Sequence, residues 1–202
     1  NTISLALLTT ALAFLIGGLL GFLAATMRGW VDQLLSRFVD IIISIPTLIF
    51  ALIVLSAVGT SIPVMISVIG LVYAMPVYRI ARAVAMDIEI MDYVEVARLR
   101  GEGLWWIMRR EILPNALTPL AAEFGLRFCF VFLLISGLSF LGLRLQPPLA
   151  DWGAMARGNA DGIAWGFYHG LVPASCIALL TISVNLLVDW LVHKASGLRE
   201  GQ

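Results

Sequence analysis

The sequence has little lysine, cysteine and histidine, and each shortage excludes a class of function. Its only lysine is Lys194, whereas a phosphate-binding loop of the GxxxxGK[ST] type needs a lysine beside its glycines. The two cysteines, Cys129 and Cys176, lie in apolar runs without metal-ligand spacing. His169 and His193 are far apart, so a metal site made from them alone is not expected. We therefore expect no metal, no cofactor and no catalysis on this chain, and any ATP must be hydrolysed by another polypeptide.

Charged residues are also scarce. They form 13% of the 202 residues, hydrophobic residues form 60%, and the mean hydropathy is +0.96. An ordinary soluble domain has roughly a quarter of its residues charged, and a soluble fold of this size could not hide so much apolar surface. The apolar runs recur without a polar linker, which predicts one domain over residues 1–202. The thirteen basic and thirteen acidic side chains cancel, so no overall charge favours nucleic acid.

Long apolar runs indicate an integral membrane protein. A bilayer core about 30 Å thick requires roughly 20 helical residues, because no backbone group exposed to lipid can stay unpaired. Five segments meet this requirement, which predicts an all-α, polytopic transmembrane bundle. Pro46 and Pro76 are expected to kink the second and third spans. The spans are Ile3 to Met27, two within Ile41 to Tyr78 that are divided by the turn Gly59 to Pro63, Pro114 to Leu143, and Leu171 to Val192.

A charged segment at about residues 79–112 separates the third and fourth spans and is too polar for lipid. Cytoplasmic loops retain arginine and lysine. If this segment is cytoplasmic, ten of the thirteen basic residues lie on its side, Arg144 and Arg157 lie outside, and Arg127 lies within a span. The loop at about 144–170 is then periplasmic.

Within the charged segment, the sequence from Asp92 to Arg110 predicts an amphipathic helix, a turn and a second helix. Gly101 interrupts it, and a glycine inside a helix costs about 1 kcal/mol relative to alanine, so we place a bend there. Such an element offers a rigid face on the inner side of the membrane. Apolar contacts would come from Ala97, Trp105 and Trp106, and polar contacts from Glu95, Arg98 and Arg100.

Two stretches of this sequence resemble one known family. Glu95, Val96, Ala97, Gly101, Leu113 and Pro114 match the "EAA" signature of inner-membrane permeases from binding-protein-dependent ABC importers. The stretches 138–143 and 151–155 are similar to the C-type subunit of dipeptide, oligopeptide and nickel permeases. Val96 departs from the usual alanine of the signature. The chain also opens abruptly at Asn1 without the extra N-terminal span of this subfamily, so we expect six spans in the intact protein.

The resemblance implies a methionine-permease-like (MetI-like) fold in the bacterial inner membrane, surrounded by lipid. It implies a homologous second permease subunit, two subunits that bind ATP and Mg²⁺, and a periplasmic or lipid-anchored solute-binding protein. The cargo would be a short peptide or a similar small polar solute. Contact with the ATPase is expected from Glu95, Ala97, Arg98, Arg100, Gly101, Trp105, Trp106, Leu113 and Pro114. Pro114 would start the fourth span at a fixed angle.

Four polar residues of the fourth span are candidates for a translocation path. Glu123 and Arg127 are four apart in the favourable acid-first order and can pair on one face. Ionisable groups at membrane depth are functional candidates, although a structural ion pair is the alternative. Ser136 and Ser139 share a face and either line the path or pack against a neighbouring helix.

The predicted periplasmic loop is a candidate for contact with the solute-binding protein through Trp152 and Met155. Its aromatic residues fit an interfacial belt equally well. Two other function classes are alternatives for the whole chain. A secondary transporter driven by an ion gradient predicts an ionisable relay and internal repeats. An intramembrane serine protease with Ser139 as nucleophile needs a histidine at matching depth on another span.

Overall fold

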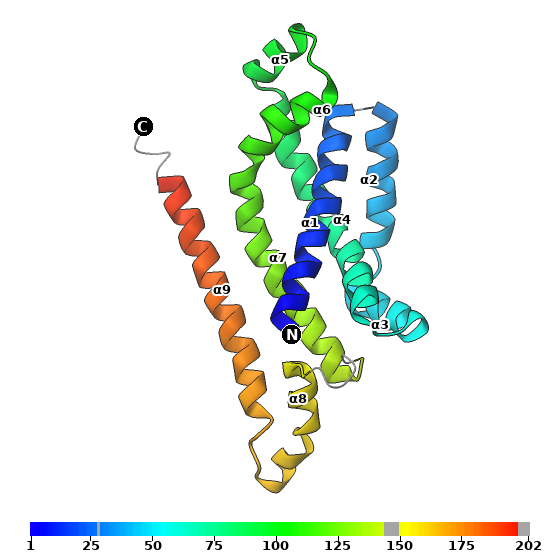
Figure 1. The fold of residues 1–202 in the computed structure, drawn as a ribbon, viewed down its shortest axis with the longest axis vertical. Coiled ribbons are helices and arrows are strands. Elements are labelled where there is room, and N and C mark those ends of the chain that lie inside the picture. The colour runs from blue at the N-terminus through cyan, green and yellow to red at the C-terminus, as the bar shows by residue number, and fades with distance from the viewer. Residues whose placement is uncertain (28, 144–149, 198–202) are drawn as a thin grey trace.

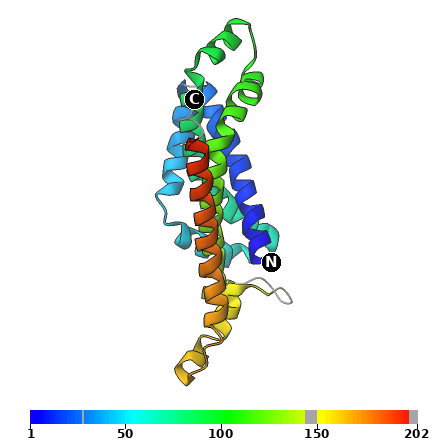
Figure 2. The ribbon, with the colours of Figure 1, turned by 90° about the vertical axis from the view of Figure 1, so that its left-hand side faces the viewer.

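The computed structural model describes residues 1–27, 29–143 and 150–197. In these ranges the regular structure is entirely helical, as the sequence predicts. The long helices lie side by side along the longest axis of the molecule (Figures 1 and 2). The elements are α1 (Thr2–Met27), α2 (Gly29–Ile43), α3 (Thr47–Val58), α4 (Ile62–Glu89), α5 (Asp92–Leu99), α6 (Leu104–Ile107), the π-helical turn η1 (Met108–Ile112), α7 (Leu113–Leu141), α8 (Trp152–Gly158), the 3-10 turn η2 (Asp161–Trp165) and α9 (Leu171–Gly197).

Four helical stretches of the described residues are long and apolar enough to cross a membrane: Thr2–Met27, Ile62–Glu89, Leu104–Leu141 and Leu171–Lys194. The pair α2 and α3 passes the same test together and bends by 84° at its break, so five spans result if this pair counts as one. The number of spans agrees with the sequence prediction. Their bounds do not all agree, since the second, third and fourth spans include charged turns that the prediction assigned to loops.

The second span begins at Gly29 and not at Ile41, and its break falls at Ser44 to Pro46. Pro46 caps α3 in an extended conformation, which confirms a break at this proline. Arg37 therefore lies within α2 and not in a cytoplasmic loop, whereas Arg28 lies outside the described residues. Pro76, in contrast, sits inside α4, which continues as one helix of 28 residues.

Helix α2 turns Asp32 and Ser36 toward α4, whereas its other polar side chains, Gln33, Arg37 and Asp40, are exposed. Arg82 of α4 donates to both carboxylate oxygens of Asp32, at 2.5 and 2.6 Å, and the hydroxyls of Ser36 and Tyr78 are 3.0 Å apart. The outward side of α2 carries exposed apolar side chains. The pairing of Asp32 inside the bundle suits a helix against lipid, where polar groups must find partners within the protein. The sequence prediction missed it because the charges alone looked like a loop. The outward side chains are Trp30, Leu34, Phe38 and Ile41.

Helices α1 and α4 pack so closely that two glycines of α1 touch the α4 backbone. A Cβ placed on Gly17 would lie 2.4 Å from the carbonyl oxygen of Ala74. One on Gly21 would lie 2.8 Å from the carbonyl oxygen of Tyr78. Small residues at such spacing let membrane helices approach and gain dispersion energy where no hydrophobic drive exists. This seam forms the centre of the bundle.

The two predicted extramembrane segments lie at opposite ends of the bundle (Figure 1). Helix α5 and the loop to α6 form one end, called the α5 end below, and α8 with η2 forms the other, the α8 end. The N-terminal residue lies toward the α8 end, where Asn1 donates to the carbonyl of Ala150 at 3.0 Å. The loop predicted at about 144–170 contains a short helix, α8, and its residues 144–149, with Arg144, are outside the described residues.

Candidate functional site

The charged segment folds as helix, turn and helix, as the sequence predicts. Helix α5 ends in a Schellman motif, in which Gly101 N–H donates to the carbonyl of Arg98 at 2.9 Å. Glu102 N–H donates to the carbonyl of Ala97 at 3.2 Å. The motif requires a left-handed residue, and Gly101 has a φ of 82°. Glycine is therefore needed here for the bend itself, since an L side chain pays about 1–2 kcal/mol in that region.

One face of α5 is docked inside the chain. Val94 and Ala97 are fully buried in a cluster with Ile107, Met108 and Ile112, which come from α6 and the π turn. Ala97 was expected to offer an apolar contact to an ATPase. The structure places it inward, where it holds α5 against the bundle.

The opposite face of α5 and α6 is exposed and carries both apolar and charged side chains. Leu99 is 82% exposed and Trp105 is 65% exposed, and Glu95 also lies on the surface. Trp106 is half-buried, with the guanidinium of Arg100 5.6 Å from its ring centre. Leu99 was missed at the sequence level, although its position two residues after the buried Ala97 places it on the outer side. We call this exposed surface the α5–α6 outer face.

An ion pair that the sequence did not reveal joins α5 to α4. Arg98 donates through Nη2 to Glu89 Oε1, and the Glu89 side chain is 0% exposed while Arg98 is 41% exposed. Glu89 is the last residue of α4. The two residues are nine apart across a turn, so no helical spacing signals the contact. Glu89 is therefore a residue of the site that only tertiary structure identifies.

The passage from α6 into α7 is one unbroken helical stretch. Leu113 N–H donates to the carbonyl of Met108, five residues back, which makes Met108–Ile112 a π turn. Pro114 follows within the first turn of α7 and has no N–H of its own to donate. Pro114 therefore does not start the span, which begins ten residues earlier at Leu104. It instead sits directly after the widened turn, a feature common at functional sites.

Glu123 and Arg127 pair on α7, as their spacing predicts. Arg127 Nε donates to Glu123 Oε1. The side chain of Glu123 is 16% exposed and that of Arg127 is 20% exposed. The guanidinium also lies 5.9 Å from the ring centre of Phe130. The charges thus neutralise each other within one helix, and this geometry suits both a structural pair and a path-lining pair.

Ser136 and Ser139 lie beneath α8 and are 4% and 0% exposed. A Cβ on Gly153 of α8 would come within 2.2 Å of the Ser136 carbonyl oxygen, so the two helices touch through small residues. Neither serine hydroxyl has a hydrogen-bond partner within the described part of the chain. In this conformation the serines face a helix contact, which supports the packing alternative.

The two residues expected to meet a solute-binding protein differ in exposure. Trp152 is half-buried and its ring meets Phe132 edge-on, with centroids 6.0 Å apart. Met155 is 47% exposed on the outer side of α8. Asp151 caps α8 by accepting from Ala154 N–H at 2.7 Å. Trp152 therefore anchors α8, whereas Met155 is free to contact a partner.

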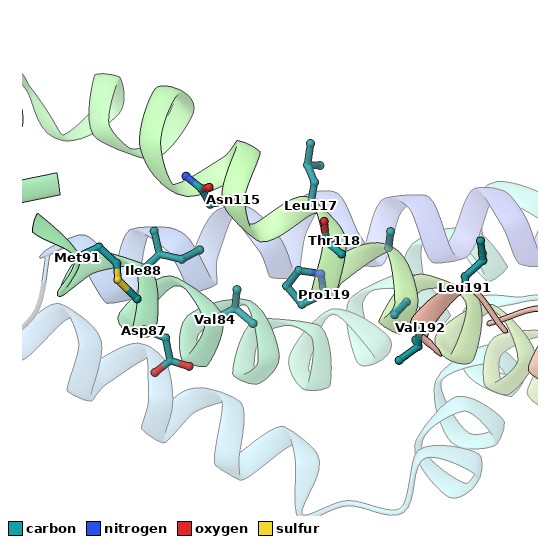
Figure 3. Close-up of a pocket in the computed structure, with 12 residues that line it drawn as sticks. Val84, Asp87, Ile88, Met91, Asn115, Leu117, Thr118, Pro119, Leu191 and Val192 are labelled. Atoms are coloured by element: carbon teal, nitrogen blue, oxygen red, sulfur yellow. The ribbon is translucent and has the colours of Figure 1, made fainter. Parts of the chain in front are cut away.

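A groove of about 790 Å³ opens between α4, α7 and α9 (Figure 3). It lies at the α4 terminus that carries Glu89 and is mostly apolar. Its polar side chains are Asp87, Asn115 and Thr118. None of the four predicted path residues lines it. Its other lining residues are Val84, Ile88, Met91, Leu117, Pro119, Ala121, Ala122, Leu191 and Val192.

No cluster of three or more potential metal ligands occurs among the residues that the structure describes. His169 precedes α9 and His193 lies in its last two turns, so the two are separated by almost the whole helix. The two histidines therefore do not share a site.

Comparison with known proteins identifies the class. Residues 17–196 match the family described as "Binding-protein-dependent transport system inner membrane component", and the chain belongs to this family. The family and the all-helical multi-pass architecture expected from the sequence are thereby confirmed.

Individual relatives are transport permeases. The chain is 29% identical over 178 residues to the glutathione transport system permease protein GsiD of Pectobacterium atrosepticum, covering 88% of this chain and 59% of that protein. It is 32% identical over 184 residues to the probable D,D-dipeptide transport system permease protein DdpC of Escherichia coli, covering 91% and 61%. It is 33% identical over 176 residues to the di/tripeptide transport system permease protein DppC of Pseudomonas aeruginosa, covering 87% and 58%. The chain thus spans about three fifths of the length of these curated relatives.

Solved structures share the fold. A chain of the MetNI methionine ABC transporter in inward-facing conformations superposes with a TM-score of 0.75 at 18% identity, covering 96% of this chain and 92% of that one. A chain of an amino acid ABC transporter with histidines gives a TM-score of 0.63 at 21% identity, covering 94% and 90%. The methionine-permease-like fold expected from the sequence is confirmed.

Proposed function

We propose that this chain is the membrane-spanning permease of an ATP-driven importer in the bacterial inner membrane. The observation that carries the proposal is the α5–α6 outer face, a surface of apolar and charged side chains held beyond the end of the bundle by buried contacts. This projecting element suits a soluble partner better than lipid, because it combines charged turns with exposed Leu99 and Trp105. Membership of the family supports the same role.

The partners would be two ATP-binding subunits, which carry ATP and Mg²⁺, a homologous second permease subunit, and an external solute-binding protein. Residues 1–202 would act as one permease domain. The contact with the ATPase would involve Glu95, Arg100, Gly101, Trp105 and Trp106, while Ala97, Arg98 and the turn before Leu113 and Pro114 would hold the element in place. Closure of the ATPases would then move α5, and differential binding to two states would alternate access to the path.

The cargo would be a short peptide or a similar small polar solute. This part of the proposal is supported by the relatives, which are named as permeases of glutathione, D,D-dipeptide and di/tripeptide transport systems. The external protein would set most of the selectivity. The Glu123 and Arg127 pair, together with Ser136 and Ser139, is proposed to lie along the path, and Met155 to meet the solute-binding protein.

Two other functions are less well supported. A protease would need Ser139 accessible and near a histidine, but Ser139 is buried under α8 and the two histidines lie beyond or near the ends of α9. A gradient-driven transporter would need an ionisable relay across several spans. Within the described bundle, the Glu123 and Arg127 pair is confined to α7, and the Arg82 and Asp32 pair joins only α4 and α2.

Gly101 provides the test. A Cβ at Gly101 meets no atom within 4 Å, so the first atom of a larger side chain has room there, while the backbone pays the left-handed strain. Gly101→Trp should therefore abolish uptake and substrate-stimulated ATP hydrolysis in the reconstituted importer, while the permease still reaches the membrane. Gly101→Asn, which tolerates the left-handed region, should retain part of the activity.

Gly103 is a matched control two residues further on. It caps α6 with a φ of −75° and a Cβ there also meets no atom within 4 Å. Serine is a preferred cap, so Gly103→Ser should transport normally. Wild-type transport by Gly101→Trp would reject the proposed coupling role.

A further inference from the structure

Helix α5 projects beyond the rest of the bundle, as both views show (Figures 1 and 2). Only a few side chains connect it to the spanning helices. Val94 and Ala97 provide an apolar seat, and the Arg98 and Glu89 ion pair provides the polar connection to α4. An apolar seat resists separation but has little directionality, whereas a charge-assisted hydrogen bond fixes orientation.

The two partners of this ion pair differ in their freedom. Glu89 has a fully buried side chain at the end of α4, and a buried carboxylate is costly unless paired. Arg98 keeps 41% of its side chain exposed and lies on the projecting helix. A displacement of α5 must therefore either carry the end of α4 with it or leave a buried charge without this partner.

We propose that Glu89 is a positioning residue that, through Arg98, passes displacement of α5 to α4. The proposal rests on the function proposed above and adds the route by which the permease is moved. Because Glu89 is buried, it cannot touch the ATPase, and its effect must run through α5.

The end of α4 also forms one wall of the groove in Figure 3. Asp87 and Ile88, which immediately precede Glu89, line the groove opposite Thr118 and Pro119 of α7. A pull on Glu89 would therefore change the separation of α4 and α7 at the groove. This consequence can be measured separately from transport.

The test places spin labels on Met86 and Leu117, which are exposed on α4 and α7. Cys129 and Cys176 are first replaced by alanine. Binding of a non-hydrolysable ATP analogue to the assembled importer should shift the distance between the labels. Glu89→Gln should abolish this shift while the ATPase still co-purifies, and uptake of alanyl-alanine per ATP hydrolysed should fall on the order of tenfold, within the usual range of coupling free energies.

Two further variants separate transmission from general damage. Arg98→Lys keeps a charge that can reach Glu89 and should retain the shift. Arg110→Gln removes an exposed arginine of the same segment that forms no ion pair with the residues described, and it should also retain the shift.

A normal shift in Glu89→Gln overturns the proposal, and so does loss of the ATPase from that variant, because the pair would then only hold α5 in shape. If the wild-type importer shows no shift and no ATP-driven uptake, the proposed function fails instead.

Discussion

The seam between α1 and α4 can be tested with one methyl group. In Gly17→Ala the new Cβ would lie 2.4 Å from the Ala74 carbonyl oxygen and 2.9 Å from the Tyr78 nitrogen. Both are backbone atoms, which cannot rotate away. Ordinary contact begins at 3.4 Å, so the helices must separate by about 1 Å locally. A gap of 0.5–1 Å forfeits roughly a quarter to a half of the dispersion attraction between facing atoms.

The expected cost follows from this overpacking. Inserting a methyl group into a tight contact costs about 1–3 kcal/mol. Gly18→Ala is the matched control, since a Cβ on Gly18 meets no atom within 4 Å and both substitutions gain the same helix propensity. The two variants should therefore differ by about 1–3 kcal/mol, which for a chain of this size corresponds to about 2–4 °C of melting temperature per kcal/mol.

The assay is thermal unfolding of the purified permease in detergent, followed by intrinsic tryptophan fluorescence. Gly17→Ala should melt below wild type, and Gly18→Ala at or above it. Equal melting temperatures for the two alanine variants would refute a close α1 and α4 contact at Gly17.

Two further predictions concern polar residues. Asp151→Ala removes the cap of α8 and should lower stability by about 1 kcal/mol, whereas Asp151→Ser keeps a cap and should melt near wild type; equal melting of both variants would contradict the capping role. Glu123→Gln leaves Arg127 without its carboxylate at membrane depth and should cost about 3 kcal/mol, part of which Glu123→Gln/Arg127→Gln should recover. If the double variant regains stability but not uptake, the pair belongs to the path, and if it regains both, the pair is structural.

In the route proposed above, Glu89 would pass a displacement of α5 to α4. Its buried carboxylate accepts from Arg98 of α5 at the end of a helix of 28 residues, and the preceding Asp87 and Ile88 line the groove. At the same end, Arg82 and Asp32 tie α4 to α2. Helix α4 is therefore joined to the projecting helix α5 by one ion pair and to α2 by another.

The sequence by itself determined the class of protein, the number of spans and the bend at Gly101. These depend on local properties, namely the length of apolar runs and the freedom of glycine at a positive φ, and such properties are written in consecutive residues. Only the tertiary structure decided that α2 is a helix with Asp32 turned inward, that Ala97 is buried while Leu99 is exposed, and that Glu89 meets Arg98. In a membrane the cost of a charge depends on its partner, and here the partner of Asp32 is fifty residues away. Contacts between residues so far apart leave no periodic signal in the sequence, so they can be identified only from the tertiary structure.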